Sequence, residues 1–381
     1  MVVADEVVFV APERIEVRVR DLDVADADVT REGSEHVLIE TAYSAISAGT
    51  EMLLYKGLMP ADVPLDAVFS HAQAAASRYP VRYGYALVGH LSPGGQRVFA
   101  FLPHASRAKV RHDELGTSVL DIPHGVSMLD GLLMPNVETA LSVVMDAQLE
   151  PGARVAVFGQ GVVGLLTAAV IKTCYPMVHV SAVDVDVSRL RRGQDLGWVD
   201  QAVPVTTETS PAQAREQLSS PDGRAPDVCI EVSGNPRALD LCLESVADHG
   251  RIVLASWYGN KHVELHRLGA RFHRSHVTLV ASQVSTLPAS LLGRWDKKRR
   301  MELVWRLVAL IRPSQLISHF ARIEHAQELY KLTARSEALQ GVLEYKHEIR
   351  DDTEREERDT LRASTTQISW KRRRVEPDSE K

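Results

Sequence analysis

Three glycines, Gly159, Gly161 and Gly164, have the GxGxxG spacing that suits a backbone built to bind phosphate. We expect the first to let the chain turn sharply, the second to let a pyrophosphate approach the backbone, and the third to let a helix pack closely on a strand. A helix starting at Val162 and Val163 would offer free N–H groups and a positive dipole end to the phosphates. The spacing therefore predicts a dinucleotide site, with an ordinary glycine turn as the alternative.

An acidic residue stands at the place where a dinucleotide site needs one. Asp184 follows Gly164 by 20 residues, and its carboxylate is expected to accept hydrogen bonds from the adenosine ribose diol. Because the same negative charge would repel a 2′-phosphate, the sequence favours NAD over NADP. Arg189 could offset that charge, so NADP stays open.

The elements that must position these residues form a βαβ unit. Residues 154–158 are a short, mostly apolar run typical of a strand buried on both faces. Residues 162–174 are apolar and indicate a helix packed on a sheet, which Pro176 would end. A second β-rich run at residues 178–183 finishes in the acidic residue. Strand, helix, second strand and carboxylate therefore occur in the order that a dinucleotide-binding unit requires.

Strand candidates alternate with helices after this unit. The strands are expected at residues 203–205, 228–232, 251–255 and 277–281, and a helix at 236–247. This alternation predicts a parallel sheet, whose ligands lie at the carboxyl ends of the strands. Ser233, Gly234 and Ser256 follow two of these strands and are the remaining cofactor-binding candidates, with a plain strand-ending turn as the alternative for each.

Outside this region the chain changes texture. Short alternating runs predict an all-β beginning at residues 1–57, and an Ala-rich stretch predicts an inserted helix and loop at residues 58–79. Two later segments, residues 126–147 and 299–311, are predicted to be helices. Pro135 stands where the first of these two helices could start or kink. A last strand is expected at residues 341–345.

The composition is that of an ordinary globular protein. The chain has 381 residues, of which 45% are hydrophobic and 25% charged, enough for two domains with their own cores. The net charge of −6 argues against a nucleic-acid-binding body. Three cysteines without CxxC spacing predict reduced core thiols. Since neither a signal peptide nor a membrane span is evident, we expect a cytoplasmic protein.

Two motifs add a family resemblance. Residues 43–51 read YSAISAGTE and residues 83–89 read YGYALVG. Together with the glycine fingerprint they resemble the medium-chain dehydrogenase/reductase superfamily, the alcohol dehydrogenase-like proteins, over about residues 1–349. The resemblance implies an α/β fold, with a Rossmann doubly wound parallel sheet domain and a GroES-like β-rich catalytic domain. The implied parts are residues 1–146 (catalytic domain, first part), 147–285 (Rossmann NAD(P)-binding domain), 286–349 (return to the catalytic domain) and 350–381 (a charged tail).

The zinc-ligand positions of that superfamily hold other residues in this chain. Zinc members have a cysteine where this chain has Ala48 and a histidine where it has Tyr85. The place of the third ligand, residues 134–136, offers no usual zinc donor, and a lobe of four close cysteines is absent. The resemblance therefore implies a branch without zinc. Within it, residues 44–51 look most like the corresponding segment of bacteriochlorophyllide dehydrogenases.

Without zinc, another group must polarise a substrate carbonyl and supply a proton. Thr50 matches the hydroxyl that relays the alcohol proton in zinc members, and Tyr85 would project its phenol toward the same spot. His104 is a third candidate, as a proton donor on a loop. The alternative role of Tyr85 is an aromatic side chain that fills space, and that of His104 is structural. Glu138 follows the third ligand place, and its alternative role is a helix cap or an ion pair.

The leading hypothesis is a zinc-independent, NAD(P)-dependent oxidoreductase acting on a carbonyl, alcohol or activated alkene. The rival hypothesis is a dinucleotide-binding sensor or scaffold that has lost catalysis. The resemblance implies a homodimer with a small-molecule substrate, and neither a membrane nor nucleic acid is expected as a partner. A basic run at residues 370–375 leaves nuclear localisation or contact with an acidic partner open.

Overall fold

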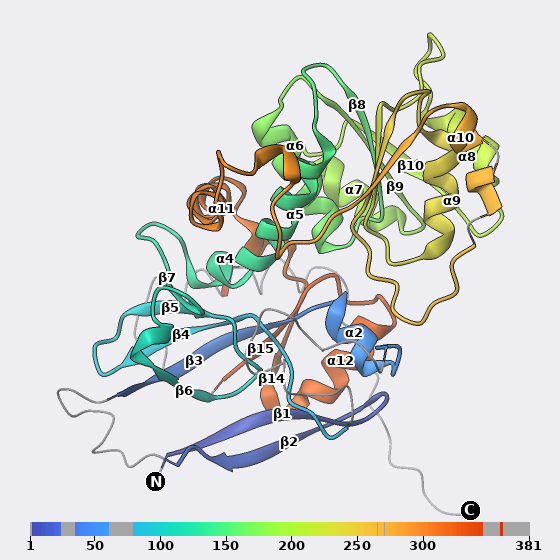
Figure 1. The fold of residues 1–381 in the computed structure, drawn as a ribbon. Coiled ribbons are helices and arrows are strands. Elements are labelled where there is room, and N and C mark those ends of the chain that lie inside the picture. Colours follow the sequence, from blue (N-terminus) through green and yellow to red (C-terminus); the bar gives the residue numbers. More distant parts are fainter. Residues whose placement is uncertain are drawn as a thin grey trace, which may run out of the picture.

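The computed structural model describes residues 2–23, 35–60, 79–264, 266–269, 271–345 and 359–360. Figure 1 shows two bodies, one built on a parallel sheet with helices and the other on antiparallel β-structure. This is the predicted α/β fold, a Rossmann domain together with a β-rich domain. Most of the expected insertion, residues 61–78, and all of the expected tail except residues 359–360 lie outside the described residues.

Six parallel strands form the sheet of the upper body in Figure 1, in the order β10-β9-β8-β11-β12-β13. Their bounds are β8 Arg154–Phe158, β9 His179–Asp184, β10 Gln201–Pro204, β11 Val228–Glu231, β12 Arg251–Leu254 and β13 Thr278–Ala281. The strand order reverses between β8 and β11. A ligand crevice is therefore expected at the carboxyl ends of these two strands.

Helices cover both faces of this sheet. They are α6 Val162–Cys174, α7 Val187–Asp195, α8 Pro211–Leu218, α9 Pro236–Ser245 and the short α10 Arg271–Arg274. In β8, Val155 and Val157 join the core that contains α6, whereas Ala156 and Phe158 join the core that contains α8 and α9. Because both faces are buried, β8 is apolar along almost its whole length, which is the pattern its sequence indicated.

The lower body contains a β1–β2 hairpin and a seven-stranded sheet in the order β14-β15-β3-β4-β5-β7, with β6 also paired to β3. The strands are β1 Val3–Ala11, β2 Arg14–Asp21, β3 His36–Ile46, β4 Leu87–Ser92, β5 Arg97–Ala100, β6 Arg107–Arg111, β7 Val119–Asp121, β14 His319–Arg322 and β15 Gly341–Glu344. The chain returns to this sheet at its end, because β15 pairs antiparallel with β3.

One helix interrupts the beginning that the sequence predicted to be all-β. Helix α2, Thr50–Tyr55, follows β3 after a short turn. Its residues 51–55 are buried, and they pack in a core shared with α12, Ala326–Ala334. A short apolar run fits a buried strand or a buried helix equally well, so periodicity alone did not separate the two.

The helical pattern at residues 126–147 is realised as two helices, α4 Met128–Leu132 and α5 Met134–Ala147. Pro135 lies in the first turn of α5, where its missing N–H leaves no hydrogen bond unmade. Helix α11, Lys297–Ile311, shares a core with α5 and α6 and lies beside them in Figure 1. It therefore packs with the parallel-sheet body, although the sequence placed it within the return to the β-rich domain.

Two further expectations concern the chain as a whole. The three cysteines carry free thiols, and Cys229 and Cys242 are buried as predicted, whereas Cys174 is exposed and does not lie in a core. Within the described ranges, no helix has the length and apolar character needed to cross a membrane.

Candidate functional site

A cleft of about 2420 Å³ is lined by side chains from both bodies. The parallel-sheet body contributes the glycine-rich loop after β8 and the loops after β9, β11 and β12. The β-rich body contributes the start of α2 and the segment before β4. Every site residue predicted from the sequence lines this cleft except Gly164 and His104.

The glycine loop combines a turn, an open face and a tight packing contact. Gly159 has a φ of +100°, and a Cβ added there would lie 2.5 Å from the Cα of Ser233. A Cβ on Gly164 would overlap the carbonyl oxygen of Gly159, so α6 needs a glycine to approach the loop this closely. Gly161, in contrast, has nothing within 4 Å of an added Cβ. Its side of the loop is open to the cleft.

The N-terminus of α6 is available for an anion. Its N-cap residue, Gly161, offers no side-chain hydrogen bond to the first turn. The first two helical residues, Val162 and Val163, both line the cleft. The uncapped N–H groups and the positive end of a 13-residue helix therefore fit a bound pyrophosphate.

Asp184 is held rigidly beside this loop. Its carboxylate accepts hydrogen bonds from the backbone N–H of Gln160 at 2.5 Å and of Asp186 at 2.8 Å. Arg189, which could have offset its charge, is engaged elsewhere: its Nη2 donates to the carbonyl of Ser336 at 2.8 Å, and its Nε lies 3.4 Å from Asp186. The carboxylate at the end of β9 thus keeps its own negative charge toward the cleft.

A fully buried carboxylate shapes the next cleft loop. Glu231, the last residue of β11, accepts hydrogen bonds from Ser233 N at 2.8 Å and from the hydroxyl of Tyr258 at 2.8 Å. Burial next to this carboxylate raises the pKa of Tyr258. Gly234 N donates to Ser256 Oγ at 2.8 Å. These contacts join the loops after β11 and β12 and hold Ser233, Gly234 and Ser256 on one cleft wall.

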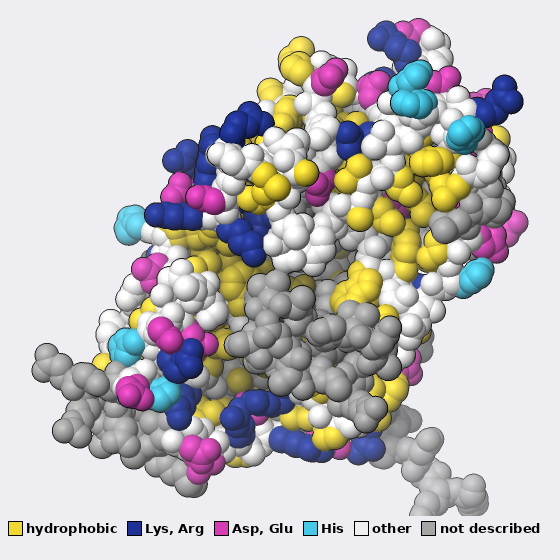
Figure 2. Space-filling view, viewed as in Figure 1, with side chains coloured by type: hydrophobic (Ala, Val, Ile, Leu, Met, Phe, Trp, Pro, Cys, Tyr) yellow, Lys and Arg dark blue, Asp and Glu magenta, His cyan; other side chains and the backbone are white. Residues whose placement is uncertain are grey.

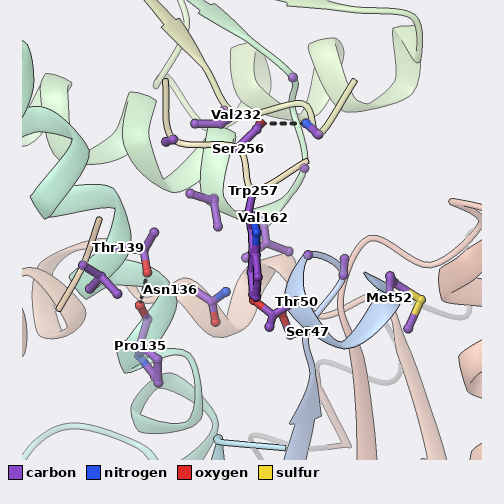
Figure 3. A pocket seen from close by; sticks show the side chains of 18 of the residues that line it. Ser47, Thr50, Met52, Pro135, Asn136, Thr139, Val162, Val232, Ser256 and Trp257 are labelled. Carbon is purple, nitrogen blue, oxygen red and sulfur yellow. Dashed lines mark hydrogen bonds between the residues drawn. The ribbon is translucent and has the colours of Figure 1, made fainter. Parts of the chain in front are cut away.

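Two hydroxyls of the β-rich body face the cleft opposite the cofactor domain. Figure 3 shows Thr50 and Ser47 below Trp257. The phenol of Tyr85 reaches the cleft and donates a hydrogen bond to Ser47 Oγ at 2.7 Å. Because Ser47 accepts that bond, its own O–H remains free to donate. Tyr85 therefore presents Ser47 to the cleft in addition to lining the cleft itself.

The structure contradicts the expectation that His104 donates a proton to substrate from a loop. Its side chain is completely buried and does not line the cleft. Its Nδ1 lies 2.7 Å from Ser44 Oγ, and its Nε2 lies 3.0 Å from Glu51 Oε2. A lone histidine in a turn gave no signal of these partners, which are 60 and 53 residues away in the sequence.

His104 belongs to a buried network behind the cleft wall. Ser44 Oγ also lies 2.7 Å from the hydroxyl of Tyr345, and the hydroxyl of Tyr330 donates to Glu51. The second oxygen of Glu51 accepts a hydrogen bond from Ser47 N at 2.9 Å. Burial raises the pKa values of both tyrosines, so they stay protonated. The network thus fixes the backbone of Ser47 from behind.

The positions that carry zinc ligands in the resembled superfamily hold residues without a thiolate, imidazole or carboxylate. Ala48 and Tyr85 line the cleft, and the third place is represented there by Pro135 and Asn136. Over the described ranges, no group of three or more His, Cys, Asp or Glu residues is placed to hold a metal ion.

Three cleft features were missed by sequence reasoning. Asn136 was considered only within the third zinc-ligand place, residues 134–136, and Trp257 was not singled out, yet Figure 3 shows both in the cleft. The third is Arg300, which is buried and donates to Glu138 at 2.5 Å. Of the two alternatives left open for Glu138, the ion pair is correct. Burial raises its pKa, although the guanidinium opposes that effect.

Comparisons with known proteins show similarity to dehydrogenases and reductases. Residues 162–295 match the family model described as zinc-binding dehydrogenase. A probable D-xylulose reductase A from Emericella nidulans is 36% identical over 118 residues, which cover 30% of this chain and 31% of that protein. Alcohol dehydrogenase 6 from Rattus norvegicus is 29% identical over 211 residues, covering 53% of this chain and 51% of the relative. The matches thus span less than two thirds of these curated relatives.

Solved structures extend the likeness to almost the whole fold. An alcohol dehydrogenase from Thermotoga maritima superposes with a TM-score of 0.70 at 15% identity, covering 91% of this chain and 100% of its own. An alcohol dehydrogenase from Escherichia coli, solved as a complex with NADH, has a TM-score of 0.68 at 16% identity and covers 90% of this chain and 99% of its own. At these identities the likeness concerns the fold.

Proposed function

We propose that this chain is an NAD(P)-dependent oxidoreductase of the medium-chain dehydrogenase/reductase superfamily. It would move a hydride between a nicotinamide and a carbonyl, alcohol or activated alkene. One observation carries the proposal: the glycine loop and Asp184 line the same cleft as the hydroxyl-bearing wall of Thr50 and Ser47. A dinucleotide lying along the glycine loop and Asp184 would bring its reactive ring to Thr50 and Ser47.

The cofactor we propose is NAD. The fixed carboxylate of Asp184 is suited to accept hydrogen bonds from a ribose diol and to repel a phosphate at the same place. The engagement of Arg189 with Asp186 and Ser336 supports the same choice, because the guanidinium is not left to bind a 2′-phosphate. Ser233, Gly234 and Ser256 would face the nicotinamide end of the cofactor.

We also propose that the reaction is independent of zinc. At the three ligand places, Ala48, Tyr85 and residues 134–136 supply no thiolate, imidazole or carboxylate. Hydrogen-bond donors are then required to stabilise charge on the substrate oxygen. Thr50 and Ser47 are placed to do so.

In this mechanism the bound nicotinamide would supply or accept the hydride at its C4. The protein contributes position and hydrogen bonds. The first turn of α6 would bind the pyrophosphate, Asp184 would orient the ribose, and Thr50 would hold or release a proton at the substrate oxygen. The glutamate–histidine network would keep Ser47 in place while the substrate binds.

Binding and turnover assays on the purified full chain test the proposal. NADH binding is followed by the fluorescence of the reduced nicotinamide, and NADH and NADPH oxidation are then screened with aldehydes, ketones and enones. We expect NADH to bind and at least one substrate class to turn over. Failure to bind either NADH or NADPH would refute the proposal, and binding of NADPH without NADH would refute the choice of NAD. Tight binding without any turnover would favour the sensor or scaffold hypothesis.

Three subsidiary proposals have their own measurements. Metal analysis that finds one zinc per chain would contradict zinc independence. Sedimentation velocity tests the homodimer that the superfamily resemblance implies. Cytoplasmic localisation is proposed from the sequence, and fluorescence microscopy of the full chain beside a deletion of residues 350–381 would reveal whether the basic run directs the protein to a nucleus.

A further inference from the structure

An amide and two hydroxyls from the two bodies of the molecule face the same part of the cleft. Figure 3 shows Asn136, in the first turn of α5, pointing into the cleft toward Trp257, with Thr50 and Ser47 below that ring. Nothing in the described part of the chain hydrogen-bonds to the Asn136 amide or to the Thr50 hydroxyl. Their hydrogen-bonding capacity is therefore left for a ligand.

A neighbouring polar residue makes the contrast clear. Thr139, one turn further along α5, also lines the cleft, but its hydroxyl donates to the carbonyl of Pro135 at 2.9 Å, as drawn in Figure 3. The Thr139 hydroxyl therefore makes its hydrogen bond within its own helix. The Asn136 amide lies on the same helix, within the third zinc-ligand place of the superfamily at residues 134–136. It makes no hydrogen bond to the described part of the chain.

Trp257 gives this corner an apolar wall. It follows β12, is 41% exposed, and its ring extends in Figure 3 from the cofactor domain toward Thr50 and Ser47. A tryptophan left this open inside a cleft offers a flat surface for an apolar or aromatic group. Val162, which also lines the cleft, is labelled beside it.

We propose that Asn136 is a catalytic residue that donates a hydrogen bond to the substrate oxygen, together with Thr50 and Ser47. We further propose that Trp257 selects substrates with a flat apolar group next to the reacting carbon. The substrate class is then an aryl or similarly flat ketone or aldehyde, or the corresponding alcohol. This inference rests on the proposed oxidoreductase function and adds to it a residue and a substrate class.

Reduction of a carbonyl can be written in full with these groups, the reduced nicotinamide and solvent water. In reduction, the carbonyl carbon gains a hydride from the reduced nicotinamide, which becomes oxidised. The C–O π pair becomes a lone pair on oxygen, and that oxygen takes a proton from solvent water, relayed through a hydroxyl of the cleft wall. Asn136 would stabilise the negative charge that develops on oxygen before the proton arrives, as amide donors do in oxyanion holes.

Binding of benzamide to the protein–NADH complex tests the role of Asn136 without relying on turnover. The amide carbonyl of benzamide resembles the substrate carbonyl but is not reduced. We expect wild-type protein to bind it, and Asn136→Leu and the isosteric Asn136→Asp each to weaken its affinity by about tenfold or more, since each lacks the donor. NADH affinity should stay within about twofold. Isothermal titration calorimetry measures both affinities, with NADH titrated into the free protein and benzamide into the protein–NADH complex.

Thr139→Val is the matched control, because it removes a cleft-lining hydroxyl that is already used within α5. Its benzamide affinity should equal that of the wild type. Asn136→Leu should unfold at the wild-type temperature, because it breaks no internal hydrogen bond. If wild-type protein binds NADH but not benzamide, or if both Asn136 variants bind benzamide as tightly as wild type, this inference is wrong while the proposed function stands. Absence of binding of both NADH and NADPH would refute both.

A second binding experiment tests the proposed substrate class. Benzamide should bind at least about tenfold more tightly than acetamide, because its ring covers the indole with apolar surface. Trp257→Ala should remove most of that preference, whereas Trp257→Phe should keep much of it. Equal affinities of wild-type protein for the two amides would overturn the assignment of Trp257.

Discussion

Two carboxylates that stand two residues apart have different tasks at the cofactor end of the cleft. Asp184 accepts backbone hydrogen bonds and faces the cleft. Asp186 is the N-cap of α7, where its Oδ1 accepts hydrogen bonds from Ser188 N at 2.8 Å and from Arg189 N at 3.4 Å. Asp184 is a candidate for binding the cofactor, and Asp186 for stabilising the fold. Substitutions at the two positions are therefore expected to separate NADH binding from stability.

Asp184→Ser is expected to weaken NADH binding by roughly tenfold or more, because a ribose diol would lose charge-assisted hydrogen bonds worth about 1.5–3 kcal/mol. NADPH binding should weaken less, since a 2′-phosphate would no longer meet the carboxylate. Fluorescence titration with each nucleotide measures the ratio. Asp184→Asn is a control that keeps the size of the side chain. Unchanged NADH affinity in Asp184→Ser would show that the ribose is bound elsewhere.

Asp186→Ala is expected to lower the free energy of unfolding by about 1 kcal/mol at neutral pH, the usual contribution of an N-cap. Partial burial tends to raise the pKa of Asp186, but hydrogen bonds from Ser188 and the nearby Arg189 outweigh it and lower the pKa. A lowered carboxyl pKa stabilises the fold above the unfolded value near 3.8, and that contribution is lost as the pH falls through the lowered pKa.

The difference between wild type and Asp186→Ala should therefore be constant above about pH 5 and should shrink as the pH falls below 4. Urea unfolding at a series of pH values measures it. Asp195→Ala, at the other end of the same helix, is the matched control, because it removes an exposed negative charge near the C-terminus and should not destabilise α7. A cap effect that persists undiminished at low pH would contradict this account.

At the scale of elements, α6 meets the loop after β8 through two glycines with opposite surroundings. Gly164 leaves no room for a side chain, because a Cβ there would overlap Gly159 O, whereas Gly161 opens to the cleft. The same GxGxxG spacing therefore contains one position that serves packing and one that serves an approaching ligand.

Gly161→Ala is expected to fold with wild-type stability within about 0.5 kcal/mol but to bind NADH at least about tenfold more weakly, because the new methyl group would lie where the pyrophosphate approaches. Gly164→Ala is expected to destabilise the protein by several kcal/mol, about the range for overpacked or strained sites. Chemical denaturation and NADH titration on both variants separate the effects. Equal NADH affinity in Gly161→Ala and wild type would refute a pyrophosphate at this loop.

At the scale of the whole molecule, the loop after β12 connects the two bodies. Gly259 has a φ of +59°, and a Cβ there would lie 2.5 Å from the carbonyl oxygen of Leu58. The next residue, Asn260, donates its backbone N–H to the same carbonyl at 3.0 Å. This loop also carries Ser256 and Trp257, so the contact couples the position of the β-rich body to the shape of the cleft.

Gly259→Ala is expected to displace this loop and so to weaken NADH binding as well as stability. Gly293→Ala provides the control, because Gly293 has a φ of +80° but nothing within 4 Å of an added Cβ. Both alanines should cost about 1–2 kcal/mol for the left-handed backbone, and only Gly259→Ala should also lower NADH affinity. Equal NADH affinities in the two variants would mean that the contact with Leu58 does not shape the cleft.

The sequence by itself determined the parts of this protein whose partners are close along the chain. The glycine spacing, the apolar run of β8, the helix that follows it and the carboxylate 20 residues later lie in one βαβ unit, whose geometry is set by local backbone rules. The lack of a usual zinc donor at Ala48 and Tyr85 was equally visible, because it concerns side-chain chemistry and not position.

Only the tertiary structure decided which side chains meet across the cleft. His104 was expected at the substrate and instead lies buried between Ser44 and Glu51, while Asn136 and Trp257, from segments 121 residues apart, turn toward the same space. The direction of a side chain depends on how its helix or loop packs against distant elements, and a one-dimensional pattern does not carry that information. The proposed catalytic half of the site was therefore decided by long-range packing, and the proposed cofactor half by local spacing.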